Sequence, residues 1–307
     1  MTLNELKYIV AVAKEKHFRK ASEACFVSQP TLSIAIKKFE EEIGVDLFER
    51  NKKEILITPI GKQIVQLAED ILQKTYLIKQ LAKEDLGDHS GEVKLGAIYT
   101  IAPYLLPKLI PLFHQMADKT PLVLQENYTH ILIEKLLNGK LDFVILSLPF
   151  EHTNIDTITL YTEPFVVALP KKHPLAEQTS VSMKQIENET LLMLGEGHCF
   201  RDQVIDAFGY KEQIQFQTHK LQKTLDGSSL ETIRYMVASG AGVTILPCSS
   251  VQSYDEEMLA IRPIYPAIPP RQVALAWRKT FPRKHLLKTM IDAVTKLKIP
   301  CTITMVQ

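Results

Sequence analysis

The sequence predicts an N-terminal all-α domain with a β-wing, a long linker helix and a C-terminal α/β domain of two subdomains. Three observations lead to this fold class. Residues 1–58 hold three short amphipathic segments and then two short apolar runs. Residues 59–87 form one continuous helical pattern, and beyond residue 91 strand and helix patterns alternate. With 307 residues, 46% of them hydrophobic, the chain is long enough for two or three ordinary buried cores.

The first domain is predicted from its helix starts and apolar spacing. Thr2 and Glu5 form a capping box that opens the first helix, whose apolar stripe is Leu3, Leu6, Val10 and Ala13. A short helix at residues 19–26 follows. Ser28 is the expected N-cap of a third helix that runs to about Gly44. The face of this helix predicted to be buried consists of Leu32, Ile36, Phe39 and Ile43.

The opposite face of the third helix carries polar groups near its N-terminal end. Two short helices, a tight turn and such a helix are typical of a helix-turn-helix that enters the major groove of DNA. Gln29 is expected to pair with a base edge, and the outward Ile34 to contact a thymine methyl group. Residues 48–58 are predicted to form the wing. The candidate DNA-binding residues are Ser28, Gln29, Pro30, Thr31, Ser33, Ile34, Lys37, Arg50, Lys52 and Lys53.

Charge alone decides little about partners. The chain has a formal net charge of +1, and residues 1–62 hold eleven Lys/Arg against nine Asp/Glu. A protein-interaction module with solvated lysines therefore remains an alternative to DNA binding. Neither a membrane span nor a signal peptide is expected, which favours the cytoplasm. The four cysteines are scattered, so we expect reduced thiols and neither a metal nor a cofactor.

The linker helix is predicted to dimerise the chain. Residues at alternating steps of four and three form a seam of roughly three heptads, and two helix-turn-helix units are needed to contact two half-sites. Packing of this helix on its own domain is the alternative. The seam consists of Ile60, Ile64, Leu67, Ile71, Lys74, Ile78 and Leu81.

The C-terminal domain, residues 91–307, is predicted to be doubly wound, with parallel strands. Subdomain I spans about 91–162 plus 268–307, and subdomain II about 163–267. Ligands in such folds bind at the carboxyl ends of strands. The positions indicated in this way are Thr100, Thr129 and the turn at 195–199.

Cys199 lies at that turn, in the first turn of a predicted helix. A helix start and neighbouring cations lower the pKa of a thiol and make it reactive. His198 and Arg201 are the neighbours expected to do so, and Asp202 is expected to orient one of them. Thr100 and Thr129 offer hydroxyls to a small polar ligand such as a peroxide. An inert cysteine at a helix start is the alternative.

The N-terminal stretch "FRKASEACFVSQPTLSIAIKKFEEEIGVDLFER", followed by "TPIG", resembles the winged helix-turn-helix of LysR-type transcriptional regulators. "GEGHCFRDQV", "YTIAPYLLPKLIP" and "THILIEKLLNGKLDFVIL" resemble the OxyR group of that family, which senses hydrogen peroxide. The resemblance implies an effector domain like periplasmic binding proteins, with two Rossmann-like subdomains. It also implies promoter DNA and RNA polymerase as partners, a homotetramer, and no enzymatic role. The resemblance implies that Cys199 is the residue that peroxide oxidises and that Thr100, Thr129 and His198 form the peroxide pocket.

One departure from the OxyR pattern affects the switch. Members of that group commonly carry a resolving cysteine nine positions after the sensing one, where this chain has Phe208. Without that cysteine, oxidation of Cys199 is expected to end as a sulfenic acid, as a mixed disulfide with a small thiol, or as a disulfide with Cys248. The remaining alternative is that peroxide sensing has been lost. Cys25 is expected to be a packing residue and Cys301 incidental. A LysR-type regulator with an organic co-inducer and a one-cysteine thiol peroxidase are the competing functions.

Overall fold

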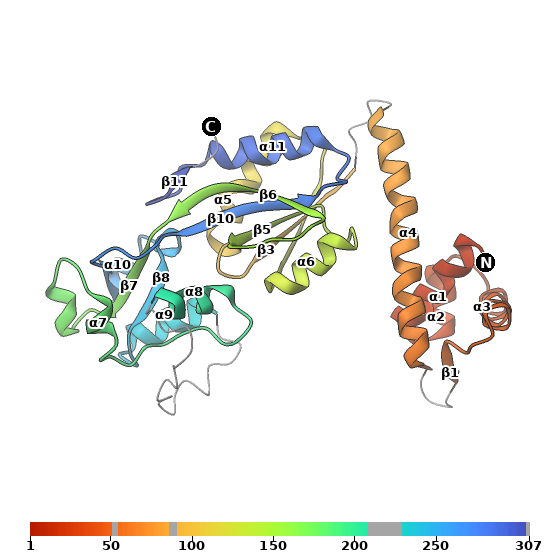
Figure 1. Ribbon diagram of the computed structural model, residues 1–307, viewed down its shortest axis with the longest axis horizontal. Helices are drawn as coiled ribbons and strands as arrows, with labels where there is room; N and C mark the ends of the chain where they lie inside the picture. The colour runs from red at the N-terminus through yellow and green to blue at the C-terminus, as the bar shows by residue number, and fades with distance from the viewer. Residues whose placement is uncertain (51–54, 86–90, 208–228, 305–307) are drawn as a thin grey trace. The chain divides into compact units, whose positions relative to one another are not determined.

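The computed structural model describes residues 1–50, 55–85, 91–207 and 229–304, and the chain divides into two compact units between residues 88 and 89. Figure 1 labels most of the helices and strands of both units. Within the described residues no helix is both long and apolar enough to cross a membrane.

The N-terminal unit contains the predicted winged helix-turn-helix. Its helices are α1 (Leu3–Glu15), α2 (Phe18–Ala24) and α3 (Gln29–Ile43), and its wing pairs β1 (Phe48–Arg50) with β2 (Ile55–Ile57) in antiparallel register. The Thr2 capping box is confirmed, and the Ser28 hydroxyl accepts a hydrogen bond from the Thr31 N–H. Gly44 is the C-cap of α3 and adopts a left-handed φ of 74°.

Two details of the predicted buried faces are wrong. In α1 the buried apolar residues are Leu6, Ile9, Val12 and Ala13, so the buried stripe is rotated away from Leu3 and Val10. Ile43 is exposed at the last residue of α3. Cys25 caps the end of α2 and packs half-buried against the core of this unit.

The long helix α4 (Pro59–Asp85) has two different apolar faces. Ile64, Val65, Ala68 and Leu72 pack into the core that includes α1. Ile60, Leu67, Ile71 and Ile78 of the predicted seam are exposed, with Leu67 61% and Ile78 66% accessible. The helix therefore packs on its own domain and still leaves an apolar face uncovered, and its role in dimerisation stays a prediction. The side chain of Leu81 lies outside the described set.

The larger unit begins with a mixed sheet in the order β11-β6-β10-β5-β3-β4. The strands are β3 (Val93–Ile98), β4 (Leu122–Asn127), β5 (Phe143–Leu148), β6 (Ile155–Glu163), β10 (Arg271–Arg278) and β11 (Ile303–Thr304). The β3 strand is parallel to β4 and β5, whereas β10 is antiparallel to β5 and β6. The expectation of a parallel sheet is therefore wrong for the strands that carry the chain to and from subdomain II.

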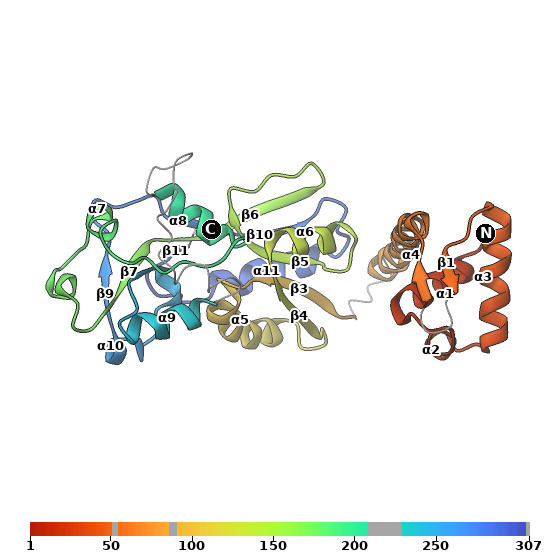
Figure 2. The same cartoon turned by 90° about the horizontal axis from the view of Figure 1, so that it is seen from below.

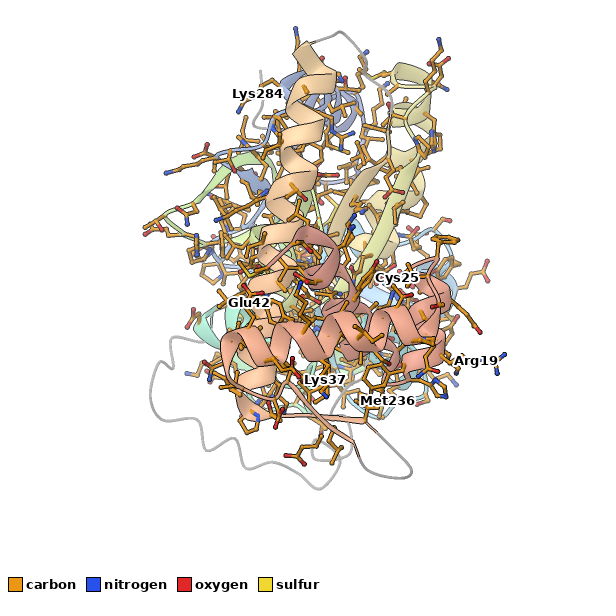
Figure 3. All side chains as sticks on the ribbon, turned by 90° about the vertical axis from the view of Figure 1, so that its right-hand side faces the viewer. Arg19, Cys25, Lys37, Glu42, Met236 and Lys284 are labelled. Atoms are coloured by element: carbon orange, nitrogen blue, oxygen red, sulfur yellow. A yellow bond between two sulfur atoms is a disulfide. The ribbon has the colours of Figure 1, made fainter. Side chains whose placement is uncertain are left out.

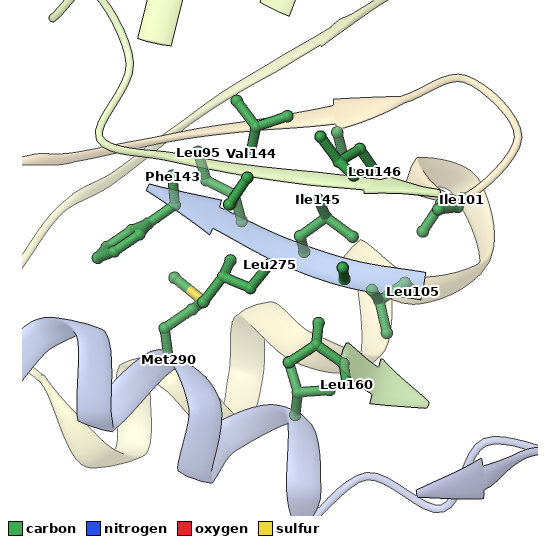
Figure 4. Close-up of a cluster of buried hydrophobic side chains, with 14 of the residues drawn as sticks. Leu95, Ile101, Leu105, Phe143, Val144, Ile145, Leu146, Leu160, Leu275 and Met290 are labelled. Atoms are coloured by element: carbon green, nitrogen blue, oxygen red, sulfur yellow. The ribbon is translucent and has the colours of Figure 1, made fainter. Parts of the chain in front are cut away.

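Helices cover both faces of this sheet. On one face α5 (Ala102–Met116) packs beside α11 (Lys284–Thr295), and α6 (Thr129–Leu137) covers the other (Figures 1 and 2). Figure 4 shows the core between sheet and helices, where Leu105, Leu275 and Met290 meet side chains of β5. This core gives the C-terminal ends of β3 and β4 a rigid support.

Subdomain II is built on a small antiparallel sheet in the order β8-β7-β9. Its strands are β7 (Phe165–Pro170), β8 (Thr244–Pro247) and β9 (Leu259–Pro263). Its longer described helices are α8 (Cys199–Ala207) and α9 (Leu230–Ala238). Shorter α-helices are α7 (Met183–Ile186) and α10 (Asp255–Met258), and short 3-10 helices are η1 (Pro174–Glu177) and η3 (Cys248–Ser250). The apolar pattern of the sequence also predicts strands at 190–195 and 214–218. The first forms only one bridge, between Leu191 and Val243, and the second lies outside the described residues.

The cysteines differ from expectation. Cys248 and Cys301 form a disulfide with their Cα atoms 6.2 Å apart, whereas Cys25 and Cys199 are free thiols. The expectation that all four are reduced is wrong, and Cys301 is not incidental. Because Cys248 is already paired with Cys301, it is not joined to Cys199 in this structure.

Candidate functional site

The site is assembled by the parallel pairing of β3 and β4. Ile98 lies opposite Asn127 at the last residues of the two strands, so the residues that follow emerge at the same edge of the sheet. Thr100 follows β3, and Thr129 begins α6 after β4. This common edge brings the two threonines together, as the sequence predicted.

Subdomain II contributes the third wall through the turn before α8. Gly197 has a φ of 90°, a left-handed conformation that favours glycine. A Cβ at this position would also stand 3.4 Å from the ring of Tyr128. Glycine thus lets the turn close against the β4 edge and places His198 and Cys199 there. One turn further along the same face of α8, the Gln203 side-chain amide donates to Ser147 Oγ at 2.8 Å and to the Leu148 carbonyl at 2.9 Å.

These segments line a partly open cavity of about 10 Å³. That is close to the smallest volume that accommodates one water-sized molecule. The cavity therefore suits a very small polar ligand. Its lining consists of Ile98, Tyr99, Thr100, Asn127, Tyr128, Thr129, Gly197, His198 and Cys199.

The Cys199 thiol has a raised pKa, because burial disfavours the thiolate. The positive charge of Arg271, the Thr129 hydroxyl and the Phe200 N–H each lower it, and the charge of Asp202 raises it. The prediction of a lowered pKa is therefore wrong in its net direction. Desolvation outweighs the helix start, and the cation that acts on the sulfur is Arg271 rather than His198 or Arg201.

The Thr129 hydroxyl oxygen is buried and, within the described chain, has no partner that meets ordinary hydrogen-bond limits. It nevertheless lies close enough to the thiol to lower the pKa of Cys199. A buried hydroxyl without a conventional partner is costly unless something fills that place. It therefore marks the point in the cavity where a ligand gains a hydrogen bond.

His198 is buried between two aromatic rings. Its ring centroid lies 4.8 Å from that of Tyr128 and 5.9 Å from that of Tyr99. Burial lowers the pKa of His198, so the imidazole is neutral near pH 7. It shapes the cavity wall and supplies no positive charge to the thiol.

Sequence analysis missed the buried ion pair behind the cavity. Arg271 Nη2 lies 2.6 Å from Glu163 Oε1, and both side chains are fully buried. Arg271 Nη1 also donates to Thr100 Oγ1 at 3.0 Å, and its guanidinium carbon stands 5.4 Å from the centre of the Phe200 ring. The sequence shows only that Arg271 precedes the apolar run 273–277 and that Glu163 ends the mixed segment 155–163.

Arg201 and Asp202 do not line the cavity. Arg201 donates to the Leu194 carbonyl at 3.4 Å and borders a different, mainly apolar cavity of subdomain II. Asp202 is exposed, and no hydrogen bond from it to His198 is found among the described contacts. The structure thus brings Thr100, Thr129, His198 and Cys199 together and leaves these two residues apart. Phe208 lies outside the described residues.

In the N-terminal unit, α3 presents the candidate DNA contacts. Ser28, Gln29, Pro30 and Thr31 are exposed at its start, and Ser33 is half-buried. Ile34 is 67% accessible, and the Lys37 ammonium lies 3.7 Å from Glu41. Figure 3 labels Lys37 on the exposed side of α3. Arg50 is the last residue of β1, and the described part of the structure does not include its side chain. Lys52 and Lys53 lie outside the described residues.

Two families match the chain. Residues 3–62 match the bacterial regulatory helix-turn-helix proteins of the lysR family, and residues 86–298 match the LysR substrate binding domain. Among curated relatives, the DNA-binding transcriptional dual regulator OxyR of Escherichia coli is 37% identical over 295 residues, which cover 96% of this chain and 95% of that protein. A hydrogen peroxide-inducible genes activator of Pectobacterium carotovorum is also 37% identical, with 96% of each chain covered.

Solved structures give the same result. Full-length OxyR from Pseudomonas aeruginosa, with a cysteine-to-aspartate substitution, has a TM-score of 0.76 and 44% identity over 97% of this chain and 99% of that one. An OxyR mutant from Corynebacterium glutamicum with hydrogen peroxide bound has a TM-score of 0.62 and 28% identity, and covers 96% of this chain and 92% of that one. The chain therefore belongs to the LysR family of DNA-binding transcriptional regulators and is of the OxyR type.

Proposed function

We propose that this regulator senses hydrogen peroxide through Cys199 and controls oxidative-stress genes. The observation that carries the proposal is the buried Thr129 hydroxyl, which lacks a conventional partner and acts on the Cys199 thiol in a cavity sized for one very small molecule. Hydrogen peroxide is only slightly larger than water and both donates and accepts hydrogen bonds. The organic co-inducer alternative finds no comparable space at this position.

The chemistry is a two-electron oxidation of the sulfur. The Cys199 thiolate attacks one peroxide oxygen, an S–O bond forms and the O–O bond breaks. The departing hydroxide takes up the proton released by the thiol and leaves as water, so the sulfur becomes a sulfenic acid. Thr129 and Thr100 hydrogen-bond to the bound peroxide, and the positive charge of Arg271 stabilises the thiolate before attack.

We propose the sulfenic acid as the signalling state. Phe208 occupies the position of a resolving cysteine, and Cys248 is already bonded to Cys301. The new oxygen adds a polar group at the first residue of α8. Because Gln203 ties this helix to β5, a change at Cys199 reaches both subdomains. If Cys199 instead ended as a mixed disulfide with a small thiol, mass analysis would show the mass of that thiol on Cys199.

The DNA-bound form is proposed to be a homotetramer built from dimers that pair through α4. The exposed seam residues Ile60, Leu67, Ile71 and Ile78 support this arrangement. Helix α3 and the wing contact promoter DNA in the cytoplasm, and oxidation changes how the assembly meets RNA polymerase. The DNA-binding residues proposed above retain these roles, with Arg50, Lys52 and Lys53 on phosphates.

The test is a Cys199→Ser variant, with Cys25→Ser as the matched control on the other free thiol. Peptide mass mapping after a peroxide pulse should find one added oxygen, trapped as a sulfenic-acid adduct, on Cys199 only. Transcription from a bound promoter should lose its peroxide response in Cys199→Ser and keep it in Cys25→Ser. Retention of the response in Cys199→Ser would overturn the proposal and leave a regulator with another inducer.

A further inference from the structure

The disulfide between Cys248 and Cys301 lies where the chain crosses between the subdomains. Cys248 begins η3 directly after β8, in subdomain II. Cys301 lies between α11 and β11, and β11 pairs with β6 through Ile303 opposite Thr162. The bond therefore fastens the end of the chain, which belongs to subdomain I, to a strand end of subdomain II.

The backbone around Cys248 is bonded to that crossover. The Cys248 N–H donates to the carbonyl of Pro164, the residue between β6 and β7, at 3.0 Å. The next N–H, that of Ser249, donates to Glu163 Oε2 at 3.1 Å. Both contacts hold η3 against the point at which β6 becomes β7.

Glu163 extends this connection to the cavity. One carboxylate oxygen accepts from Ser249, and the other accepts from Arg271 Nε at 2.8 Å and from Nη2 at 2.6 Å. Arg271 in turn donates to Thr100 and acts on the Cys199 thiol. Each step from Cys248 to Cys199 is thus a described contact or charge effect between buried or half-buried groups.

The disulfide is accessible to small reagents, since Cys301 is exposed and Cys248 half-buried. Disulfides in compartments that keep thiols reduced are usually transient and redox-sensing rather than structural. Exchange with a small disulfide proceeds through a mixed disulfide on one of the two cysteines.

We propose that Cys248 and Cys301 form a second redox site, which exchanges with small-molecule disulfides and whose state sets the reactivity of Cys199 through Glu163 and Arg271. This inference deepens the proposed function, because it adds the state of the thiol pool as a second input to the same sensor. Closure joins two protein thiols by an S–S bond and reduces one small disulfide to two thiols, which take up the two protons.

The direction of the coupling follows from the contacts. The closed bond holds η3, and with it the Ser249 N–H, against Glu163, which fixes Arg271 beside Thr100 and the thiol. Opening the bond releases the chain end and loosens this arrangement. Cys199 therefore loses part of the positive charge that favours its thiolate and reacts more slowly.

The first arm of the test follows the pair itself. Full-length Cys199→Ser protein is equilibrated in buffers from fully reduced to fully oxidised glutathione, quenched with acid, alkylated and mapped by mass spectrometry. Cys248 and Cys301 should lose their alkylation together over a single transition and appear as one linked peptide pair. Alkylation of both residues in every buffer, or a glutathione adduct on one without linkage, would overturn the second redox site.

The second arm measures coupling without relying on peroxide. The rate at which iodoacetamide labels Cys199 is compared between the closed wild-type chain and the Cys248→Ser/Cys301→Ser double variant, which retains no unpaired partner thiol. A coupling of ordinary size lowers this rate about fivefold in the double variant. The matched control, Cys25→Ser, should label at the wild-type rate, and equal rates in all three proteins would refute the coupling.

The two proposals fail in different ways. If the closed chain labels Cys199 faster than the double variant but peroxide leaves Cys199 unoxidised, the coupling stands and peroxide sensing falls. If peroxide oxidises Cys199 equally fast in both proteins, sensing stands and the coupling falls. Circular dichroism of the double variant checks that its secondary structure matches that of the wild type.

Discussion

Arg271 and Glu163 form a buried ion pair, with Nη2 and Oε1 2.6 Å apart, between the strands that enter and leave subdomain II. Arg271 begins β10 and Glu163 ends β6, and the two residues lie opposite each other in the register of these strands. Both also contact groups outside their strands: Arg271 donates to Thr100, and Glu163 accepts from Ser249. The pair therefore joins the sheet of subdomain I, the cavity and subdomain II.

Replacing Glu163 with Gln should strongly destabilise the effector domain. The change leaves Arg271 as an uncompensated buried charge, which costs about 3 kcal/mol or more in comparable pairs. Chemical denaturation followed by tryptophan fluorescence measures the loss, since the single Trp of the chain, Trp277, lies on β10. The double variant Glu163→Leu/Arg271→Leu removes both charges and should recover part of that stability. A Glu163→Gln protein as stable as the wild type would contradict this account.

The pH dependence of Cys199 labelling should reflect its burial. Because burial raises the pKa of this thiol, the iodoacetamide rate should increase with pH with a midpoint above the ordinary value of a cysteine. The same cysteine in denaturant is the control and should show the ordinary midpoint. A midpoint in the folded chain below that of the unfolded chain would show that Arg271 and the helix start outweigh desolvation.

The sequence predicted the order and bounds of most elements because their signals are local. The Thr2 capping box sets the start of α1, and the Ser28 cap and Gly44 set the two ends of α3, within a residue. β5 coincides with the apolar run 143–148, a pattern typical of a strand buried on both faces. The direction of β10 was not predictable in this way, because antiparallel pairing with β5 depends on how the chain returns from subdomain II.

The candidate site was predictable only in part. Thr100, Thr129 and Cys199 follow a strand or begin a helix, so local patterns place them at one edge. Arg271 and Glu163 are 108 residues apart, and their pairing depends on tertiary structure. The direction of the pKa shift of Cys199 was predicted wrongly for the same reason, since desolvation is set by packing and not by neighbours in the sequence.

Replacing Thr129 with Val should slow the reaction of Cys199 with peroxide. Valine preserves the shape of threonine but removes the hydroxyl that lowers the pKa of the thiol and that is available to bind peroxide. A lost hydrogen bond of ordinary strength, about 1 kcal/mol, corresponds to a rate about fivefold lower. Stopped-flow oxidation gives the rate. Thr295→Val, which removes a hydroxyl bonded within α11, is the matched control and should react at the wild-type rate.

Replacing Cys301 with Ser should destabilise the oxidised protein and leave the reduced protein nearly unchanged. The disulfide closes a loop with a sequence separation of 53, and the chain-entropy model assigns such a loop up to about 4 kcal/mol. Thermal unfolding with and without a reductant measures the difference. Under reducing conditions the variant and the wild type should unfold together. An oxidised variant that matches the oxidised wild type would show that the bond adds no stability.

Replacing Ile34 with Ala should weaken the binding of DNA only where a thymine methyl group faces α3. Ile34 is 67% accessible on the outward face of this helix, and loss of its apolar contact should lower affinity about fivefold, or about 1 kcal/mol. Fluorescence anisotropy with a bound promoter site gives the affinity, and substitution of deoxyuridine for each thymine in turn removes one methyl group at a time. At the contacted position the losses of affinity caused by Ile34→Ala and by deoxyuridine should not add, because each change removes the same contact. The control variant Leu3→Ala, at an exposed apolar residue of α1, should bind the promoter site and its deoxyuridine versions with wild-type affinity. Additive losses of affinity for Ile34→Ala at every thymine would rule out the contact.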